Sequence, residues 1–371
     1  MATRSPNKFV VHAVGGCGIS VADKVLSRVA DLGEGYAEFE FNYVDASRAN
    51  IDNIKPRGEF WQIDQQNADG SRIDGSGGER HENADSIVKC MAKYLDDKDI
   101  RKPVTGIYHM VVSSVSGGSG SVFAAVLIQE FLRRGIPVLP VLIGDTSDRQ
   151  KIQNTVKSFQ SLSNYSFTMD KPIVVYYVDN RNKQIKLKDR EKYANDILFR
   201  DLSAISIFFS GMNESIDYAD MIGMLYPSFY TSFKIKCGVH QLQVFDKEPP
   251  YVPDIDPDEK NKGDKYPEGF SSPLIGRVLT DADGNFDINF SLYQYKIGKI
   301  ISQNVLQKYT TGQSPYLPLY MFVMNDPFTS IITECEENLI PVYKQADDDI
   351  KSTDLCAMTN AKVDEKTGLV L

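Results

Sequence analysis

Short apolar runs alternate with stretches of helical periodicity along the first half of the chain. Residues 8–14 (KFVVHAV) form the first run, and a glycine-rich stretch and apolar residues at helical spacing follow it. Comparable apolar runs lie at residues 106–115, 136–143 and 172–178, and residues 36–44 (YAEFEFNYV) also predict a strand. Strands that are apolar along their whole length are buried on both faces. The pattern therefore predicts a parallel β-sheet that is covered by helices on both sides.

The second half of the chain has a more mixed pattern. Apolar residues at helical spacing from about Arg190 to Gly211 predict one long helix. The further elements that the sequence predicts are strands at residues 233–245, 274–280 and 317–324 and helices at about residues 289–309 and 328–339. We expect an α/β protein in which the long central helix, residues 189–212, joins a Rossmann-like parallel-sheet domain to a smaller α+β domain.

The expected domain boundaries follow these changes of pattern. The parallel-sheet domain is predicted to span residues 1–188, and the smaller α+β domain residues 213–345. Residues 346–371 contain three consecutive aspartates, Asp347 to Asp349, and little apolar periodicity. This last segment is therefore expected to form an acidic, flexible tail.

Charge and composition argue against several classes of function. A formal net charge of -9 and a pI near 5.1 argue against direct binding to nucleic acid, whose phosphates attract an excess of Lys and Arg. No apolar stretch approaches the roughly 20 residues that cross a bilayer, so we expect a cytoplasmic protein with no membrane contact. The five cysteines and four histidines lack the spacing of a metal site, and no metal-ligating residue is predicted.

A stretch rich in glycine and serine, residues 116–121, lies where a predicted parallel strand meets a helix. Backbone N–H groups and the helix dipole make an anion site at such a junction, although a tight turn without a ligand explains the same residues. The chain has no GxxxxGK[ST] motif, which excludes a P-loop nucleotidase. The first glycine turn, residues 15–18, fits the GxGxxG fingerprint poorly, whereas Asp45 at the end of the second strand suits a ribose contact.

Six motifs, in the same order along the chain, resemble those of the tubulin and FtsZ superfamily. Residues 116–121 (SGGSGS) are similar to the family's GGGTGS/T phosphate signature, and residues 15–18 (GGCG) are similar to its first glycine turn. The other four are VDASRANI (44–51), GSGGERHENADSI (75–87), YANDIL (193–198) and SIDYAD (215–220). The resemblance covers roughly residues 9–225, and beyond them only the order of the elements agrees.

The resemblance implies that residues 1–188 bind GTP or GDP together with Mg²⁺. The residues that it assigns to the phosphates are Gly15, Gly16, Cys17, Gly77, Gly78, Ser116, Gly117, Gly118, Ser119, Gly120 and Ser121. It also implies that Asn195 and Asn180 contact guanine, since an amide both donates and accepts hydrogen bonds. For Asn180, closing a turn is the alternative. Asp148 is a candidate ribose contact or, equally, the N-cap of a helix over residues 149–162.

Asp217 and Asp220 lie in the segment that resembles the family's catalytic loop. Two carboxylates three residues apart project together if a helix has begun there, although they could merely complement a helix dipole. The resemblance implies that these acids reach the γ-phosphate bound to the adjacent subunit, so that hydrolysis depends on assembly. Two positions depart from the family pattern, since Val122 replaces a glycine and Ser215 replaces an asparagine.

Short length, divergent loops and an acidic tail make the chain most similar to the phage and plasmid tubulins. This resemblance implies a GTP-dependent, self-assembling cytomotive filament that positions or segregates phage or plasmid DNA in the cytoplasm of a bacterial host. The implied partners are further copies of the chain, joined head to tail, and a DNA-binding adaptor or phage cargo. Three alternatives remain open: an FtsZ-like division ring, a nucleotide-binding scaffold that hydrolyses nothing and, more distantly, a metabolic α/β enzyme.

Overall fold

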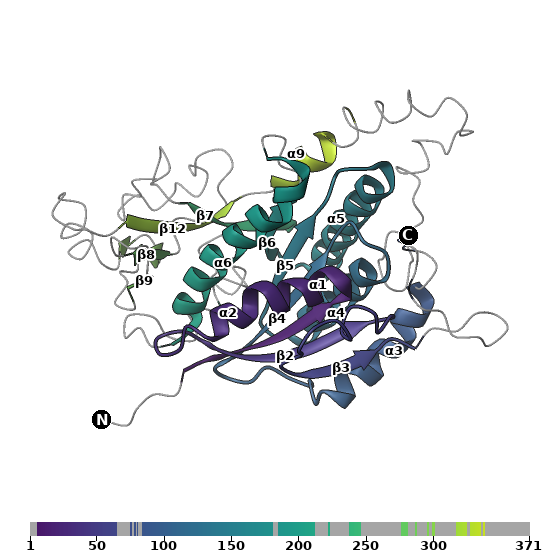
Figure 1. The fold of residues 1–371 in the computed structure, drawn as a ribbon, viewed down its shortest axis with the longest axis horizontal. Coiled ribbons are helices and arrows are strands. Elements are labelled where there is room, and N and C mark those ends of the chain that lie inside the picture. Colours follow the sequence, from purple (N-terminus) through teal and green to yellow (C-terminus); the bar gives the residue numbers. More distant parts are fainter. Residues whose placement is uncertain are drawn as a thin grey trace.

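The computed structural model describes most of the first 245 residues and parts of the remainder. The described residues are 6–64, 75, 78, 80, 84–180, 185–211, 222, 237–245, 276–280, 286–287, 295–296, 299–300, 317–324, 327–334 and 337. One large sheet runs through this part of the molecule, and helices cover both of its faces (Figure 1).

Seven neighbouring strands of this sheet run parallel to one another. They are β1 (Lys8–Val14), β2 (Glu38–Asp45), β3 (Glu59–Gln62), β4 (Ile107–Ser114), β5 (Val138–Gly144), β6 (Ile173–Asp179) and β7 (Val239–Phe245). Their order across the sheet is β3-β2-β1-β4-β5-β6-β7. The chain leaves β1 toward one edge and returns to β4 on the other side, so a crevice is expected at the carboxyl ends of these two strands.

The helices form one layer on each face of the sheet (Figure 1). On one face lie α1 (Gly15–Val21), the π-helical segment η1 (Ala22–Leu26), α2 (Ser27–Ala30) and α6 (Arg190–Phe209), which the short 3-10 helix η3 (Leu187–Asp189) precedes. On the other face lie α3 (Ala84–Asp97), α4 (Ser119–Arg134) and α5 (Arg149–Met169). The first glycine stretch is thus the opening turn of α1 rather than a separate turn, and α6 confirms that one long helix begins at Arg190.

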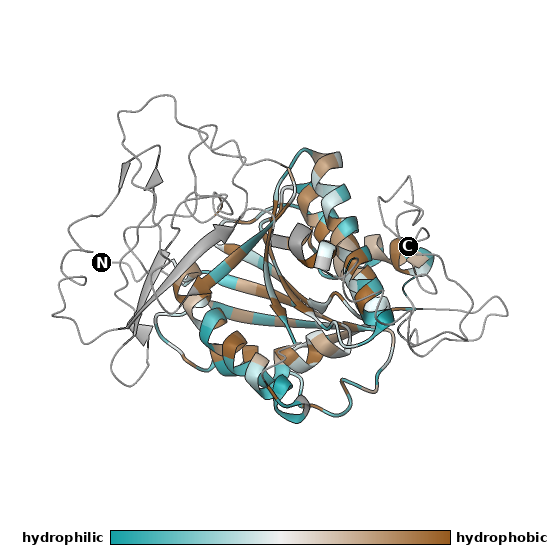
Figure 2. Ribbon diagram, turned by 90° about the horizontal axis from the view of Figure 1, so that it is seen from above, coloured by the Kyte–Doolittle hydropathy of each residue, from teal (hydrophilic) through white to brown (hydrophobic). Residues whose placement is uncertain are grey.

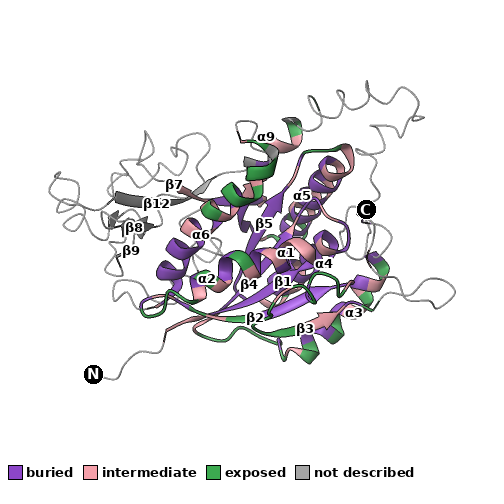
Figure 3. Ribbon diagram, in the orientation of Figure 1, coloured by how far each residue is buried: buried purple, intermediate pink, exposed green. Residues whose placement is uncertain are grey.

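The central strands are buried on both faces, as their apolar sequences predict (Figure 3). Apolar residues lie on the strands and on the inner sides of the helices, and polar residues on the outer sides (Figure 2). Phe9 on β1 packs against Tyr108 on β4 and Phe209 on α6, with ring centroids 5.8 Å and 5.3 Å away. All three rings are completely buried, and each contributes about 1.5–3 kcal/mol by leaving water. This contact attaches the end of α6 to the sheet.

The sheet continues beyond β7 with antiparallel strands. These elements are β12 (Leu317–Met324), β8 (Gly276–Thr280) and β9 (Phe286–Asp287), and α9 (Pro327–Glu334) packs nearby through Phe328, which stacks on Phe159 of α5. The helix predicted over residues 289–309 is wrong, because β10 (Tyr295–Lys296) and β11 (Lys299–Ile300) form an antiparallel pair there. Aromatic and β-branched residues such as Tyr295 and Ile300 favour a strand over a helix.

The structure confirms the predicted fold class, an α/β protein with a Rossmann-like parallel sheet. The domain boundaries at residues 188, 212 and 345 stay predictions, and the predicted tail, residues 346–371, lies outside the described residues. No helix among the described residues is long and apolar enough to cross a membrane.

Candidate functional site

A cavity of about 400 Å³ opens at the carboxyl ends of the parallel strands. Its lining includes the last residues of β1, β2, β4 and β5 and the residue after β6, which are Val14, Asp45, Ser114, Gly144 and Asn180. Residues 15–17 and 116–121 line it as well, so that the two glycine-rich segments predicted to bind phosphate lie in one place. This is the crevice that the strand order predicts, and ligands of open α/β sheets bind at such a position.

The two glycine-rich segments contact each other through their backbones. Gly15 has φ +70, and a Cβ atom on it would lie 3.1 Å from Gly120 Cα. A Cβ on Gly120 would in turn lie 3.2 Å from Gly15 Cα. Because neither glycine has a side chain, the N-termini of α1 and α4 lie in contact and together form one floor of the cavity. The first N–H groups of a helix have no partner inside the helix, so this floor is suited to an anion.

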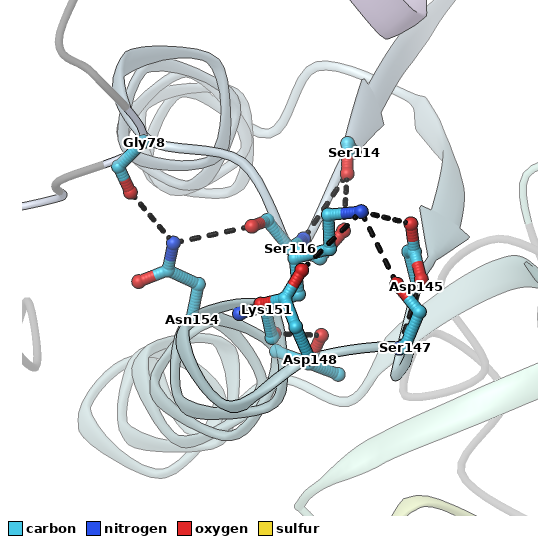
Figure 4. Close-up of polar contacts among 9 residues, drawn as sticks. Gly78, Ser114, Ser116, Asp145, Ser147, Asp148, Lys151 and Asn154 are labelled. Carbon is cyan, nitrogen blue, oxygen red and sulfur yellow. Dashed lines mark hydrogen bonds and ion pairs between the residues drawn. The ribbon is translucent and has the colours of Figure 1, made fainter.

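A row of hydrogen bonds fixes the loop 116–121 from behind. Ser116 N–H donates to Ser114 Oγ at 3.1 Å, and the Asn154 side chain on α5 donates to Ser116 O at 3.1 Å and to Gly78 O at 2.8 Å (Figure 4). Asn154 thus connects the loop to the segment that resembles the family's γ-phosphate loop. Gly78 contributes its carbonyl to this connection and is not one of the residues that line the described cavity.

Asp45 and Asn50 form a polar pair on the wall next to α1. Asp45 is largely buried, and its carboxylate accepts hydrogen bonds from Ala46 N–H at 2.8 Å and from Asn50 Nδ2 at 3.0 Å. Asn50 Nδ2 is also the atom nearest to Gly16, only 2.6 Å from where a Cβ would stand. A side chain at position 16 would displace Asn50, so glycine keeps this wall open.

Asn180 brings a buried acceptor to the opposite side of the cavity. Its backbone N–H donates to Gly144 O at 2.9 Å, which holds the residue at the end of β6. Its Oδ1 atom is buried and accepts no hydrogen bond within the described part of the chain. A buried amide oxygen of this kind costs about 1–3 kcal/mol unless a ligand supplies a donor. Guanine offers N–H donors at N1 and at its exocyclic amine, so the site fits this base.

Asp145, which follows β5, and Lys151 on α5 line the same cavity as Asn180, and sequence reasoning missed both. Lys151 Nζ lies 2.7 Å from Asp145 Oδ2 and 3.2 Å from Ser147 Oγ (Figure 4). Burial on its own raises the pKa of Asp145, but hydrogen bonds from Lys151 and Ser147 outweigh it, and the pKa of this carboxyl is lowered. The hydrogen bond to Asp145 raises the pKa of Lys151. The pair is therefore ionised at neutral pH.

Of the two roles predicted for Asp148, a ribose contact and a helix N-cap, the structure supports the N-cap. Its carboxylate accepts a hydrogen bond from Lys151 N–H at 2.9 Å and so caps α5. Of the acids in this turn, Asp145 lines the described cavity and Asp148 does not. The ribose contact of Asp148 stays a prediction, and the N-cap is what the structure supports.

The remaining predicted residues are placed as follows. Burial, helped by Glu191 and Asp145, raises the pKa of the Cys17 thiol to about 12, so Cys17 lines the cavity as a neutral thiol. Asn195 lies half-buried on α6 and is not a lining residue of the described cavity. Val122 is completely buried in the core. The other predicted residues, Gly77, Asp217, Asp220 and Ser215, lie outside the described residues.

Two further side chains at the site, Asn50 and Arg80, had no role predicted from the sequence. Arg80 is 1% exposed and lies behind the loop 116–121. Asn50 belongs to the motif at residues 44–51 and Arg80 to the motif at residues 75–87, but the resemblance implies no role for either residue. Among the described residues, no three His, Cys, Asp or Glu side chains are grouped so that they could hold a metal ion.

No protein-family model matches the sequence, and comparison with curated proteins finds no related sequence. Three solved structures illustrate which folds are similar. A protofilament of TubZ from bacteriophage PhiKZ is 18% identical with a TM-score of 0.61, over 93% of this chain and 94% of that chain. The phage tubulin PhuZ with GDP is 14% identical with a TM-score of 0.60, over 98% and 99%.

The third structure, a GTPgS-bound protofilament of CetZ2 from Haloferax volcanii, is 15% identical with a TM-score of 0.55, over 90% of this chain and 99% of that chain. In all three cases the alignment includes nearly the whole of both chains. The chain therefore has the fold of the tubulin and FtsZ superfamily, in a form similar to that of the phage tubulins.

Proposed function

We propose that the chain is a GTPase that assembles head to tail into cytomotive filaments and positions or segregates phage or plasmid DNA. The observation that carries the proposal is the cavity at the carboxyl ends of the parallel strands, with a glycine floor on one side and the buried Asn180 oxygen on the other. The similarity in fold to two proteins solved as protofilaments, one of them bound to GTPgS, supports the same conclusion.

Each part of the cavity has a role in this proposal. The backbone of residues 15–17 and 116–121 binds the phosphates, because N–H groups at helix openings stabilise negative charge. Asn180 selects guanine through its buried oxygen, and Asn195 contacts the same base. Asp45 and the Asp145–Lys151 pair, which line the cavity, hold the ribose hydroxyls in this proposal. Mg²⁺ bound with the nucleotide would offset the phosphate charge, and the phosphates and water would supply most of its ligands.

Hydrolysis in this proposal is completed by a second copy of the chain. Asp217 and Asp220 of one subunit orient the water that attacks the γ-phosphate held by the next subunit, since phosphoryl transfer needs mainly positioning and charge stabilisation. Nucleotide turnover is then coupled to assembly. The filament acts in the cytoplasm of a bacterial host and moves DNA through an adaptor or phage cargo, because a chain with a net charge of -9 is poorly suited to bind DNA itself.

Two assays on the purified chain test the proposal together. Pelleting and light scattering should show assembly with GTP or a slowly hydrolysed analogue, but none without nucleotide. Phosphate release per molecule should rise with protein concentration, because the catalytic site spans two subunits. Asp220→Ala should abolish release and keep the filaments. Asp96→Ala, which removes an exposed acid on α3, is the matched control and should change neither property.

Three outcomes separate the alternatives. Absence of any assembly with GTP and its analogue would refute the filament proposal. Assembly without phosphate release in the wild type would indicate a scaffold. Release that does not depend on protein concentration would indicate a site complete within one chain, as in a metabolic enzyme.

A further inference from the structure

Helix α5 presents a buried row of polar side chains to the underside of the loop 116–121. Asn154, Ser158 and Ser161 follow one another at spacings of four and three residues and lie on one face of the helix. They are 5%, 2% and 0% exposed. The buried face of a helix is ordinarily apolar, so this polar row requires a structural reason.

The row, together with Ser121 on α4, ties back four successive carbonyl groups of the loop. The hydrogen bonds are Ser158 Oγ to Val115 O at 2.7 Å, Asn154 Nδ2 to Ser116 O at 3.1 Å, and Ser121 Oγ to Gly117 O at 2.7 Å and Gly118 O at 2.8 Å. Ser158 shares its proton with the carbonyl of Asn154 in its own helix, also at 2.7 Å. Asn154 and Ser158 donate from α5, behind the loop, and Ser121 donates from the first turn of α4.

These bonds determine where the N–H groups of the loop point. In a planar trans peptide, the C=O of one residue and the N–H of the next point in opposite directions. Anchoring the carbonyls of residues 115–118 behind the loop therefore turns the N–H groups of residues 116–119 to the other side. The N–H of Ser116 donates to Ser114 Oγ. Those of Gly117, Gly118 and Ser119 are directed to the side on which these residues line the cavity.

Arg80 controls the direction in which the hydroxyls of Ser121 and Ser158 point. Its Nη1 atom donates to Ser121 Oγ and to Ser158 Oγ, both at 2.7 Å, and Nη2 donates to Ser161 Oγ at 3.4 Å. A guanidinium can only donate, so each serine oxygen must accept from it, and the single serine proton is left for a loop carbonyl. Burial lowers the pKa of Arg80 to about 10, which still leaves it charged at neutral pH.

We propose that Arg80 is a positioning residue for the phosphates of the nucleotide. It fixes the Ser121 and Ser158 hydroxyls, these hold the carbonyls of the loop, and the loop N–H groups thereby face the cavity before a ligand enters. Preorganised donors need no reorganisation when the anion binds. The positive charge of Arg80 also lies directly behind the anion floor. The inference rests on the proposed function for the identity of the ligand.

The test compares a ligand with phosphates and a ligand without them. Dissociation constants for GDP and guanosine are measured on Arg80→Gln and Arg80→Lys. Glutamine can accept as well as donate, so both serine hydroxyls regain the freedom to turn. Arg80→Gln should weaken GDP binding by about tenfold or more and leave guanosine within about twofold, because hydrogen bonds that involve a charge are the strong ones. Arg80→Lys keeps a charged donor but loses the planar fork that reaches several serines, so it should weaken GDP binding less than Arg80→Gln does and leave guanosine within about twofold.

Circular dichroism shows whether Arg80→Gln folds. If it does not fold, the milder substitution Ser158→Ala tests the same inference. Ser158→Ala removes one carbonyl tie and should weaken GDP about threefold without affecting guanosine. Ser203→Ala is its control, since Ser203 is equally buried but donates to Phe199 O within α6. Equal weakening of GDP and guanosine, or no change in either, would overturn the inference and leave the proposed function standing. If the wild type binds neither ligand, the proposed function fails, and the inference fails with it.

Discussion

A pair of buried histidines makes the stability of the sheet dependent on pH. His12 on β1 and His109 on β4 are 0% and 7% exposed, and their rings contact each other through Nε2 of His12 and Nδ1 of His109 at 3.0 Å. Nδ1 of His12 lies 2.6 Å from the Tyr94 hydroxyl on α3. Burial lowers the pKa of His109 to about 4, and burial, then His109 and Lys98, lowers the pKa of His12. Both rings are therefore neutral in the folded protein at pH 7.

The sign and size of the effect follow from His109. In the unfolded chain its pKa returns to about 6.5, so the unfolded state binds a proton first as the pH falls. The contribution of His109 to the free energy of unfolding is complete above pH 6.5 and is lost as the pH falls from there toward about 4. Between pH 8 and pH 5.5, linkage gives a loss of about 1.4 kcal/mol from His109 alone. His12 adds a loss of the same sign.

Urea unfolding at pH 8 and pH 5.5 measures this loss for the wild type and for His109→Gln. The chain has one tryptophan, Trp61, whose ring centroid lies 5.1 Å from that of Tyr94, so its fluorescence reports on this part of the sheet. The lower pH stays above the pI of about 5.1, which limits precipitation. Between the two pH values, the free energy of unfolding should fall by about 1.4 kcal/mol more for the wild type than for His109→Gln. Equal losses in the two proteins would refute the reasoning.

Three further substitutions test other contacts. Asn180→Ala should weaken GTP binding and reduce the preference for GTP over ATP in competition assays, because it removes the buried acceptor. Tyr176→Phe should cost about 1.5–3 kcal/mol in urea unfolding, because it removes the 2.7 Å hydrogen bond from β6 to the buried Asp201 on α6. Gly18→Ala should lower the melting temperature, with a cost of about 1–3 kcal/mol, because its Cβ would collide with the backbone carbonyl of Val112.

The sheet could be predicted from the sequence because its strands differ so clearly from their surroundings. Runs such as residues 8–14 and 136–143 are apolar on both faces. A strand in a parallel sheet that helices cover on both sides buries such a run. Their parallel arrangement also brings their carboxyl ends to one edge. That is why residues as distant as Gly15, Ser116 and Asn180 could be expected at one cavity.

Contacts that depend on tertiary packing could not be predicted in this way. Asp145, Asp148 and Lys151 lie within seven residues, and local sequence does not show which acid caps α5 and which faces the cavity. Local periodicity also failed at residues 289–309, where aromatic and β-branched residues recur at spacings that suit either a helix or a strand. Arg80 lies in the motif at residues 75–87, but its contacts with Ser121 and Ser158 are 41 and 78 residues away, so the motif alone does not indicate its position.

The charges around the cavity explain how an acidic chain can hold an anion. Its charged lining residues in the described part of the chain are Asp45, Asp145 and Lys151, which sum to a negative charge. Side chains on the lining therefore do not attract phosphate. Under the proposed function, the described groups that attract the phosphates are the backbone N–H groups at the openings of α1 and α4 and the buried charge of Arg80 behind them. Because packing fixes these groups, we expect them to discriminate by the shape of the phosphate chain as well as by its charge.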